Sequence, residues 1–183
     1  MMLGFAIEGF ILSAILMQII PLLGGLGLTR DTLLVTSVFG PAQVLSRLTN
    51  MLLGRNLSAT RLAVIAAALP PLAIVVVLLT APSLSGAVAF AILFGLGAGL
   101  TSIVAGSLPL QLLGRENYGA RLGWLSSARQ VASAVSPFCL ALAMVAFGPG
   151  GALWLTSVLG LLSTLAFVAV GVLTRRTAVV GVG

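Results

Sequence analysis

Long apolar stretches alternate with short clusters of glycine, proline and polar residues along the 183-residue chain. A transmembrane helix needs about 20 apolar residues to cross a hydrocarbon layer of about 30 Å. Six such stretches predict six transmembrane helices, at about 3–23, 33–53, 62–80, 86–112, 121–147 and 152–173. The clusters between them, such as GGLG at 24–27 and GPGG at 148–151, are typical of helix ends. The pattern predicts an all-α membrane protein with a single transmembrane domain over residues 1–183.

The composition agrees with this pattern and excludes most soluble functions. Hydrophobic residues make up 60% of the chain and charged residues 7%, with a mean hydropathy of +1.24, whereas soluble domains carry about 25% charged residues. The chain has no histidine, three acidic residues and one cysteine, Cys139. We therefore expect no enzyme, no cofactor and no metal site. The basic residues, all arginine, are too few and scattered to favour a nucleic-acid partner.

The arginines are distributed unevenly between the two sides of the predicted bundle. Six lie on one side, in the second and fourth connections and in the C-terminal tail: Arg55, Arg61, Arg115, Arg121, Arg175 and Arg176. The other side carries Arg30 alone, next to Asp31. The positive-inside rule places the arginine-rich side in the cytoplasm, so both termini are expected there, in a bacterial inner membrane. The first stretch lacks a basic region and a cleavage site, so we expect a retained helix and not a signal peptide.

Two of the predicted helices carry a polar stripe. Polar or small residues recur every three or four positions in 33–53 (Thr36, Gly40, Gln43, Arg47, Asn50) and in 121–147 (Ser126, Arg129, Ser133, Ser136). Steps of three and four place residues on one helix face, and a polar face is costly against lipid. We therefore expect the two stripes to line a water-accessible cavity. The two arginines in it suit an anionic solute, because a guanidinium binds a carboxylate through two parallel hydrogen bonds. Gln43, Arg47, Arg129 and Ser133 are the predicted ligands of a small, anionic solute. Alternatively, both arginines extend to the cytoplasmic headgroups.

Glu8 is the third ionisable residue inside a predicted helix. Such residues commonly mark ion or proton pathways, so Glu8 is a candidate coupling residue. The alternative is a structural role, in which Glu8 neutralises one of the two arginines. Gly95, Gly99, Ser102 and Gly106 share one face of the stretch 86–112, a pattern typical of close helix packing.

Three segments resemble the C-terminal half of a major facilitator superfamily transporter. They are FGPAQVLSR at 39–47, followed by Asn50, Gly54 and Arg55; FGLGAGLT at 94–101, running to Pro109; and GRENYGARLG at 114–123, followed by ARQ at 128–130 and SPF at 136–138. The resemblance covers essentially the whole chain as helices seven to twelve of that fold. It implies a half bundle of two three-helix repeats, with Asn50, Gly54 and Arg55 as a degenerate version of the family's cytoplasmic loop motif. Gln43 and Arg47 match a spacing in monocarboxylate-type members, with glutamine in place of an acid.

The family's function follows from the resemblance as an expectation. It implies secondary active transport of a small solute by alternating access, with this bundle moving against another. The family has twelve helices, so the chain is expected to be a gene fragment, a half-transporter that pairs with another chain, or a distinct six-helix protein. The rival function is that of a non-transporting membrane remnant or scaffold subunit. The sequence does not indicate the solute, the direction of transport or the coupling ion.

Overall fold

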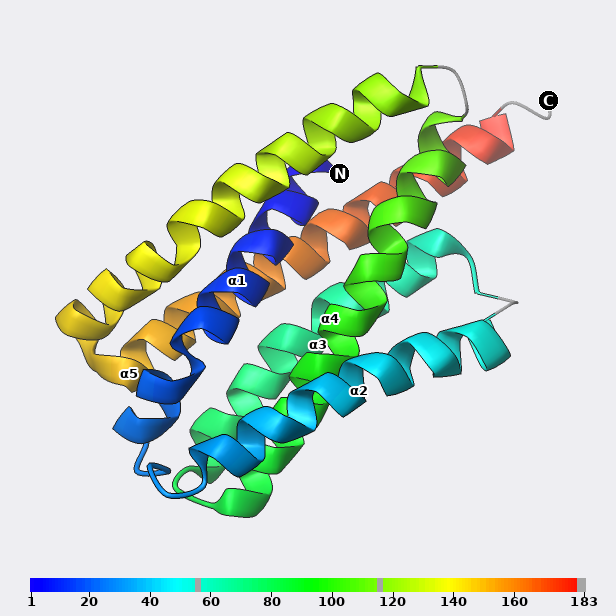
Figure 1. Cartoon of the computed structure of the whole chain (residues 1–183). Coiled ribbons are helices and arrows are strands. Elements are labelled where there is room, and N and C mark those ends of the chain that lie inside the picture. The colour runs from blue at the N-terminus through cyan, green and yellow to red at the C-terminus, as the bar shows by residue number, and fades with distance from the viewer. Residues whose placement is uncertain (55–56, 115–116, 181–183) are drawn as a thin grey trace.

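The computed structural model describes residues 1–54, 57–114 and 117–180, without the side chains of 53, 113 and 175–180. Five helices make up this part of the chain (Figure 1): α1 (Met2–Gly25), α2 (Thr32–Leu53), α3 (Ala59–Thr80), α4 (Leu84–Leu113) and α5 (Tyr118–Val180). The all-helical prediction is confirmed for the described residues. The predicted stretches 3–23, 33–53, 62–80 and 86–112 correspond to α1, α2, α3 and α4 in turn.

The last two predicted stretches, 121–147 and 152–173, both lie within α5. This helix folds back on itself at Gly148 (Figure 1), whose φ of 72° and ψ of 171° are not helical. Glycine adopts a positive φ readily because it lacks a Cβ atom, and Pro149 follows directly. Five helices, the last of them folded double, therefore stand in place of the six that the sequence predicted. We call residues 118–147 arm A and residues 149–180 arm B of α5.

Long apolar helices dominate the described part of the chain. Four of its helical segments are long and apolar enough to cross a membrane: Met2–Gly25, Ala59–Thr80, Leu84–Leu112 and Tyr118–Thr174. The segment 33–53 was also predicted to span, but α2 is not among the four, because its polar stripe makes it less apolar. Large hydrophobic side chains are exposed to an extent unusual in soluble proteins, reaching 78% at Leu33 and 86% at Val145. These features are those of a membrane protein.

Helix α1 packs between the two arms of α5. The hydroxyl of Ser13 donates a hydrogen bond of 2.9 Å to the carbonyl of Ser133 in arm A. On the other side, the hydroxyl of Ser163 in arm B donates to the carbonyl of Gly4 at 3.1 Å. The rings of Phe5 and Phe167 meet edge to face, with centroids 5.1 Å apart. Arm B is therefore held against α1 by polar and aromatic contacts together.

The remaining helices continue from arm B around the bundle. Thr164 of arm B donates a hydrogen bond of 2.9 Å to the carbonyl of Ala67 in α3, and α3 in turn packs along α4. Helix α2 packs on α4, and it makes little contact with α1. The order of packing is thus α2, α4, α3, arm B, α1 and arm A. The bundle is an arc whose open side lies between α2 and the pair formed by α1 and arm A.

The predicted small-residue face of α4 brings α2 close. A Cβ atom added at Gly95 would lie 2.9 Å from the carbonyl oxygen of Phe39, and one added at Gly99 would lie 2.6 Å from that of Gln43. The packing role predicted for these two glycines is confirmed. Gly106, on the same predicted face, has no atom within 4 Å of an added Cβ. It lies beyond the α2 contact, where its carbonyl accepts a hydrogen bond from Tyr118.

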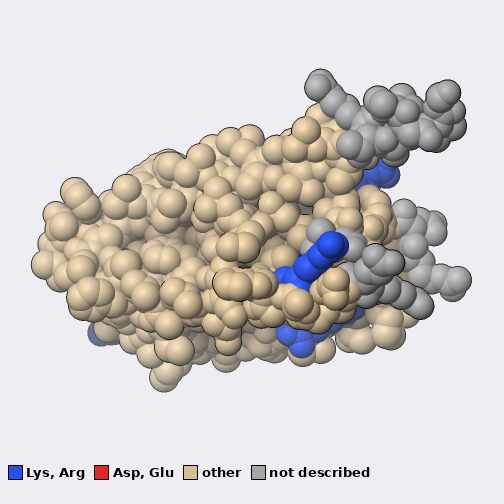
Figure 2. Space-filling model, turned by 90° about the horizontal axis from the view of Figure 1, so that it is seen from above, with Lys and Arg blue, Asp and Glu red and all other residues tan. Residues whose placement is uncertain are grey.

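Alternate connections lie at opposite ends of the molecule. The ends of α2 and α4 lie where the chain ends, whereas the ends of α1 and α3 and the reversal at Gly148 lie at the far end (Figure 1). Most basic atoms on the face seen in Figure 2 gather towards one end. The predicted orientation rests partly on Arg55, Arg115 and Glu116, which lie outside the described residues. The side chains of Arg175 and Arg176 lie outside them as well. The cytoplasmic location of the termini therefore stays a prediction.

Candidate functional site

The middle of each polar stripe, Gln43 and Arg47 on α2 and Arg129 and Ser133 on arm A, lines one pocket on the open side of the arc. This pocket has a volume of about 360 Å³ and is lined by residues of α1, α2, α4 and arm A: Gly9, Leu12, Ser13, Leu16, Met17, Gln43, Arg47, Ala98, Ser102, Arg129 and Ser133. All four predicted solute ligands are among them. The structure therefore brings Gln43, Arg47, Arg129 and Ser133 together, although their role as solute ligands stays a prediction. We call this the arginine pocket.

The charges of the arginine pocket are all positive. Arg47 is exposed on α2, and Arg129 is half-buried on arm A. The other polar groups lining the pocket are one amide, from Gln43, and three hydroxyls. Two guanidinium groups without an acidic side chain in the lining favour a negatively charged ligand, since each offers five N–H donors and no acceptor.

Gly9 fixes the position of Arg129 against α1. A Cβ atom added at Gly9 would lie 2.5 Å from the Cγ atom of Arg129, 2.9 Å from the Oγ atom of Ser133 and 3.2 Å from the backbone oxygen of Arg129. The aliphatic stem of Arg129 therefore packs directly on the backbone of α1. This contact anchors the stem of the Arg129 side chain against α1, which argues against a side chain that extends freely towards the headgroups.

Gly9, Ser13 and Met17 of α1 and Ser102 of α4 were not predicted as site residues. The three residues of α1 are spaced by four, so they share one helix face, but a stripe of glycine, serine and methionine is only weakly polar. Ser102 was assigned to the packing face of α4. Its hydroxyl donates to the carbonyl of Gly99 within the helix at 2.7 Å, and its side chain also lines the pocket.

Glu8 is buried next to the arginine pocket, one residue before Gly9. Only 1% of its surface is exposed. Its two carboxylate oxygens accept hydrogen bonds from the hydroxyls of Thr101 in α4, at 3.4 Å, and of Ser163 in arm B, at 3.2 Å. Arg129 packs against Gly9, the next residue of α1. The hydrogen-bond partners of Glu8 are thus hydroxyl groups, and Glu8 lies beside the position of α1 that Arg129 contacts.

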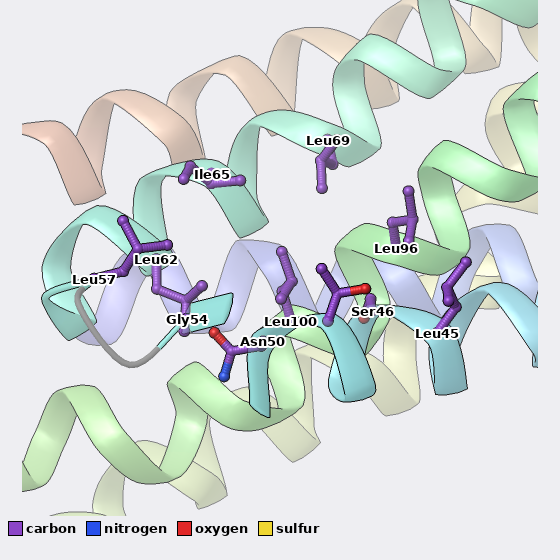
Figure 3. Close-up of a pocket in the computed structure, with 11 residues that line it drawn as sticks. Leu45, Ser46, Asn50, Gly54, Leu57, Leu62, Ile65, Leu69, Leu96 and Leu100 are labelled. Carbon is purple, nitrogen blue, oxygen red and sulfur yellow. The ribbon is translucent and has the colours of Figure 1, made fainter. Parts of the chain in front are cut away.

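The predicted loop motif lies at a second pocket, at the end of α2. Asn50 and Gly54 line this pocket of about 410 Å³ with apolar residues of α2, α3 and α4 (Figure 3). The Oδ1 atom of Asn50 is buried and has no hydrogen-bond partner among the described residues. It lies against Gly54, where an added Cβ atom would collide with it. Arg55, the third residue of the motif, lies outside the described residues.

Comparisons with known proteins identify no relative of this chain. No family model matches it, and neither the curated proteins nor the solved structures contain a significant match. The functional interpretation therefore rests on the arrangement of the site itself.

Proposed function

We propose that this chain is one half of a secondary active transporter that moves a small, anionic solute across a membrane by alternating access. The observation that carries the proposal is the arginine pocket, in which Gln43 and Arg47 of α2 are grouped with Arg129 and Ser133 of arm A. An ionisable residue inside a membrane is costly and usually serves a function. Two arginines at one pocket, on helices that make a bundle of apolar segments, are best explained by a ligand of opposite charge.

A carboxylate is the ligand that suits these groups. A guanidinium can form two parallel hydrogen bonds with a carboxylate, and Gln43 and Ser133 can donate to further oxygen atoms of the solute. A hydrogen bond to a charged group contributes about 1.5–3 kcal/mol. Loss of one guanidinium would then weaken binding by roughly 10- to 100-fold. The pocket volume of about 360 Å³ accommodates a small molecule.

Glu8 is the proposed coupling residue. Glu8 immediately precedes Gly9, the residue of α1 against which the stem of Arg129 packs, so its carboxyl group and the solute site share Arg129 as a neighbour. A solute anion bound to Arg129 would weaken the attraction between Arg129 and Glu8, so binding of the solute and binding of a cation or proton at Glu8 would favour each other. Carboxylates inside transporters commonly carry protons or ions in this way.

The open side of the arc supports a function that needs a second bundle. The arginine pocket opens between α2 and the pair of α1 and arm A, and the side chain of Arg47 is exposed there. The resemblance to the C-terminal half of a major facilitator superfamily transporter fits this opening, because in that fold the solute lies between two six-helix halves. Under this proposal α5 counts as two helices, and the bundle consists of two three-helix repeats. The arginine-rich side and both termini would lie in the cytoplasm of a bacterial cell.

Ligand binding by the purified chain tests the proposal. The chain is reconstituted in lipid nanodiscs, and binding of radiolabelled lactate, benzoate and succinate is measured. We expect at least one of these carboxylates to bind, and Arg47→Gln and Arg129→Gln to weaken binding by roughly 10- to 100-fold. Arg30→Gln is the matched control, because Arg30 is exposed in the connection between α1 and α2 and does not line the pocket. Equal binding by all four proteins would refute the assignment of the pocket, and no binding by any would favour a non-transporting scaffold.

A further inference from the structure

A third pocket lies away from the arginine pocket. It has a volume of about 810 Å³ and lies where α3 begins and where α4 and arm B end, at residues Leu57, Ser58, Thr60, Arg61, Val64, Ile65, Gln111, Leu112, Val168, Gly171, Val172 and Thr174. We call this the terminal pocket. No residue of the arginine pocket takes part in it, so it is a separate site.

The lining of the terminal pocket has two chemically different parts. Arg61 and Gln111 supply a cation and an amide, and Ser58 and Thr60 supply hydroxyls beside them. Apart from Gly171 and Thr174, the rest of the wall is aliphatic, with Val64 and Val168 among its members. Among the residues that the structure describes, no acidic side chain belongs to the lining. An arrangement of this kind matches a molecule with an anionic polar end and a hydrocarbon body.

Hydrogen bonds hold the polar part in place. The Oε1 atom of Gln111 accepts a hydrogen bond of 3.1 Å from the backbone nitrogen of Ala59, so the amide NH₂ group is the part of Gln111 that can donate to a ligand. Ser58 caps α3 by accepting a hydrogen bond of 3.3 Å from the backbone nitrogen of Arg61. Gln111 therefore fixes the end of α4 against the start of α3, and the cap fixes the backbone of Arg61 in the first turn of α3, at the same pocket.

The close approach of α3 and arm B forms the apolar part. A Cβ atom added at Gly171 would lie 2.9 Å from the Cγ2 atom of Thr60, so the two helices nearly touch there. Val168 and Val172, on either side of Gly171 along arm B, are 40% and 48% exposed. Their side chains thus present apolar surface into a pocket at the end of helices that are long enough to span a membrane.

We propose that the terminal pocket binds one anionic phospholipid, with its phosphate at Arg61 and Gln111 and an acyl chain along Val64, Val168 and Val172. Arginine binds phosphate oxygens through two parallel hydrogen bonds. A basic residue near the membrane surface attracts anionic lipid about fivefold in binding constant. A lipid bound here would join α3, α4 and arm B at the end of the molecule where the arginines collect.

Retention of lipid by the purified chain tests this proposal. The full chain is purified in detergent, supplied with phosphatidylglycerol or phosphatidylcholine, and examined by native mass spectrometry. We expect one tightly retained phosphatidylglycerol per chain and at least fivefold less phosphatidylcholine. Arg61→Gln should lower retention of phosphatidylglycerol about fivefold, and Val172→Trp, which fills the apolar part, should lower retention of both lipids. Inorganic phosphate should fail to compete, because it lacks the acyl chain.

Two control variants separate a specific site from general attraction to lipid. Arg30→Gln removes a positive charge outside the pocket, and Val145→Trp adds the same bulk to an exposed position of arm A. Both should retain phosphatidylglycerol as the unmodified chain does, and circular dichroism should show equal helix content in all variants. Equal retention of the two lipids, or unchanged retention by a folded Arg61→Gln chain, would overturn the proposal. Competition by inorganic phosphate would do so as well, by showing a free-phosphate site.

Discussion

At the scale of single residues, serine and threonine hydroxyls make up most of the buried polar side chains of the described residues. Thr156 donates to the carbonyl four residues before it at 2.8 Å, and Ser13 and Ser163 donate to carbonyls of neighbouring helices. Such bonds are favourable in an apolar interior because the alternative is an unsatisfied polar group. Against this background Glu8 and Arg129 differ in kind from their neighbours. They are ionisable groups in an interior whose other buried polar side chains are mainly hydroxyls.

The contact at Gly9 leads to a prediction about stability. Gly9→Ala should destabilise the protein by about 1–3 kcal/mol, the usual cost of overpacking, because the new methyl group would meet both the side chain and the backbone of Arg129. Gly40→Ala is the matched control, since a Cβ atom added at Gly40 has nothing within 4 Å. Thermal unfolding in detergent, followed by tryptophan fluorescence, measures the difference. Equal melting temperatures for the two variants would contradict the close packing of α1 on arm A.

Asn50 allows a prediction of the opposite sign. Its buried Oδ1 atom lacks a hydrogen-bond partner among the described residues, and an unsatisfied buried polar atom costs about 1–3 kcal/mol. Asn50→Leu, which is similar in size and faces the apolar lining of its pocket, should therefore raise the melting temperature. Ser37→Leu, at an exposed position of α2 outside the lining of this pocket, controls for added hydrophobicity. A lower melting temperature for Asn50→Leu than for the unmodified chain would show that the oxygen is satisfied.

At the scale of helices, local sequence predicted most of the structure. Apolar length and glycine or proline clusters located α1 to α4 within a few residues, because both signals act within a few turns of the chain. The same signals separated 121–147 from 152–173, and the structure joins them in α5 with a break at one residue, Gly148. The backbone conformation of Gly148 decides where the chain turns. The cluster of three glycines and a proline does not specify which of its residues adopts that conformation.

The reversal of α5 predicts a difference between neighbouring glycines. Gly148→Ala should destabilise the protein by about 1–3 kcal/mol, the cost of a backbone region that essentially only glycine adopts, since Gly148 has a φ of 72° and a ψ of 171°. Gly150→Ala serves as the control, because an added Cβ atom has nothing within 4 Å at either position. Unfolding by increasing denaturant, in a mild detergent, gives the free energies of unfolding of the two variants. If Gly150→Ala proves the more harmful, Gly148 is not the turning point.

The candidate site could be predicted only as far as helical periodicity reaches. The steps of three and four residues placed Gln43 with Arg47 and Arg129 with Ser133, and the structure groups both pairs at one pocket. Periodicity within a helix does not determine which helices are neighbours. Gly9 and Ser102 enter the pocket because α1 and α4 form part of its wall, and the two hydroxyl partners of Glu8 come from helices remote in sequence. These features arise from packing between helices and carry no local signal.

At the scale of the whole molecule, the arc of helices separates three regions of different chemistry. The arginine pocket opens on one side, the terminal pocket lies at one end, and apolar side chains cover much of the remaining surface. The connections alternate between the two ends (Figure 1). This alternation makes the orientation in a membrane testable, because exposed residues at the two ends should be reached from opposite sides.

Cysteine labelling can determine that orientation. Cys139 is first replaced by serine, and single cysteines are then introduced as Ala120→Cys, at the start of α5, and Thr29→Cys, in the connection after α1; both positions are exposed. The positive-inside rule places the side of Arg121 in the cytoplasm. In intact bacterial spheroplasts a membrane-impermeant maleimide should therefore label Thr29→Cys and should label Ala120→Cys only after permeabilisation. The reverse result would place the arginine-rich end outside, where few anionic lipids or cytoplasmic partners could reach Arg61, and labelling of both positions in intact cells would show that the helices do not span the membrane.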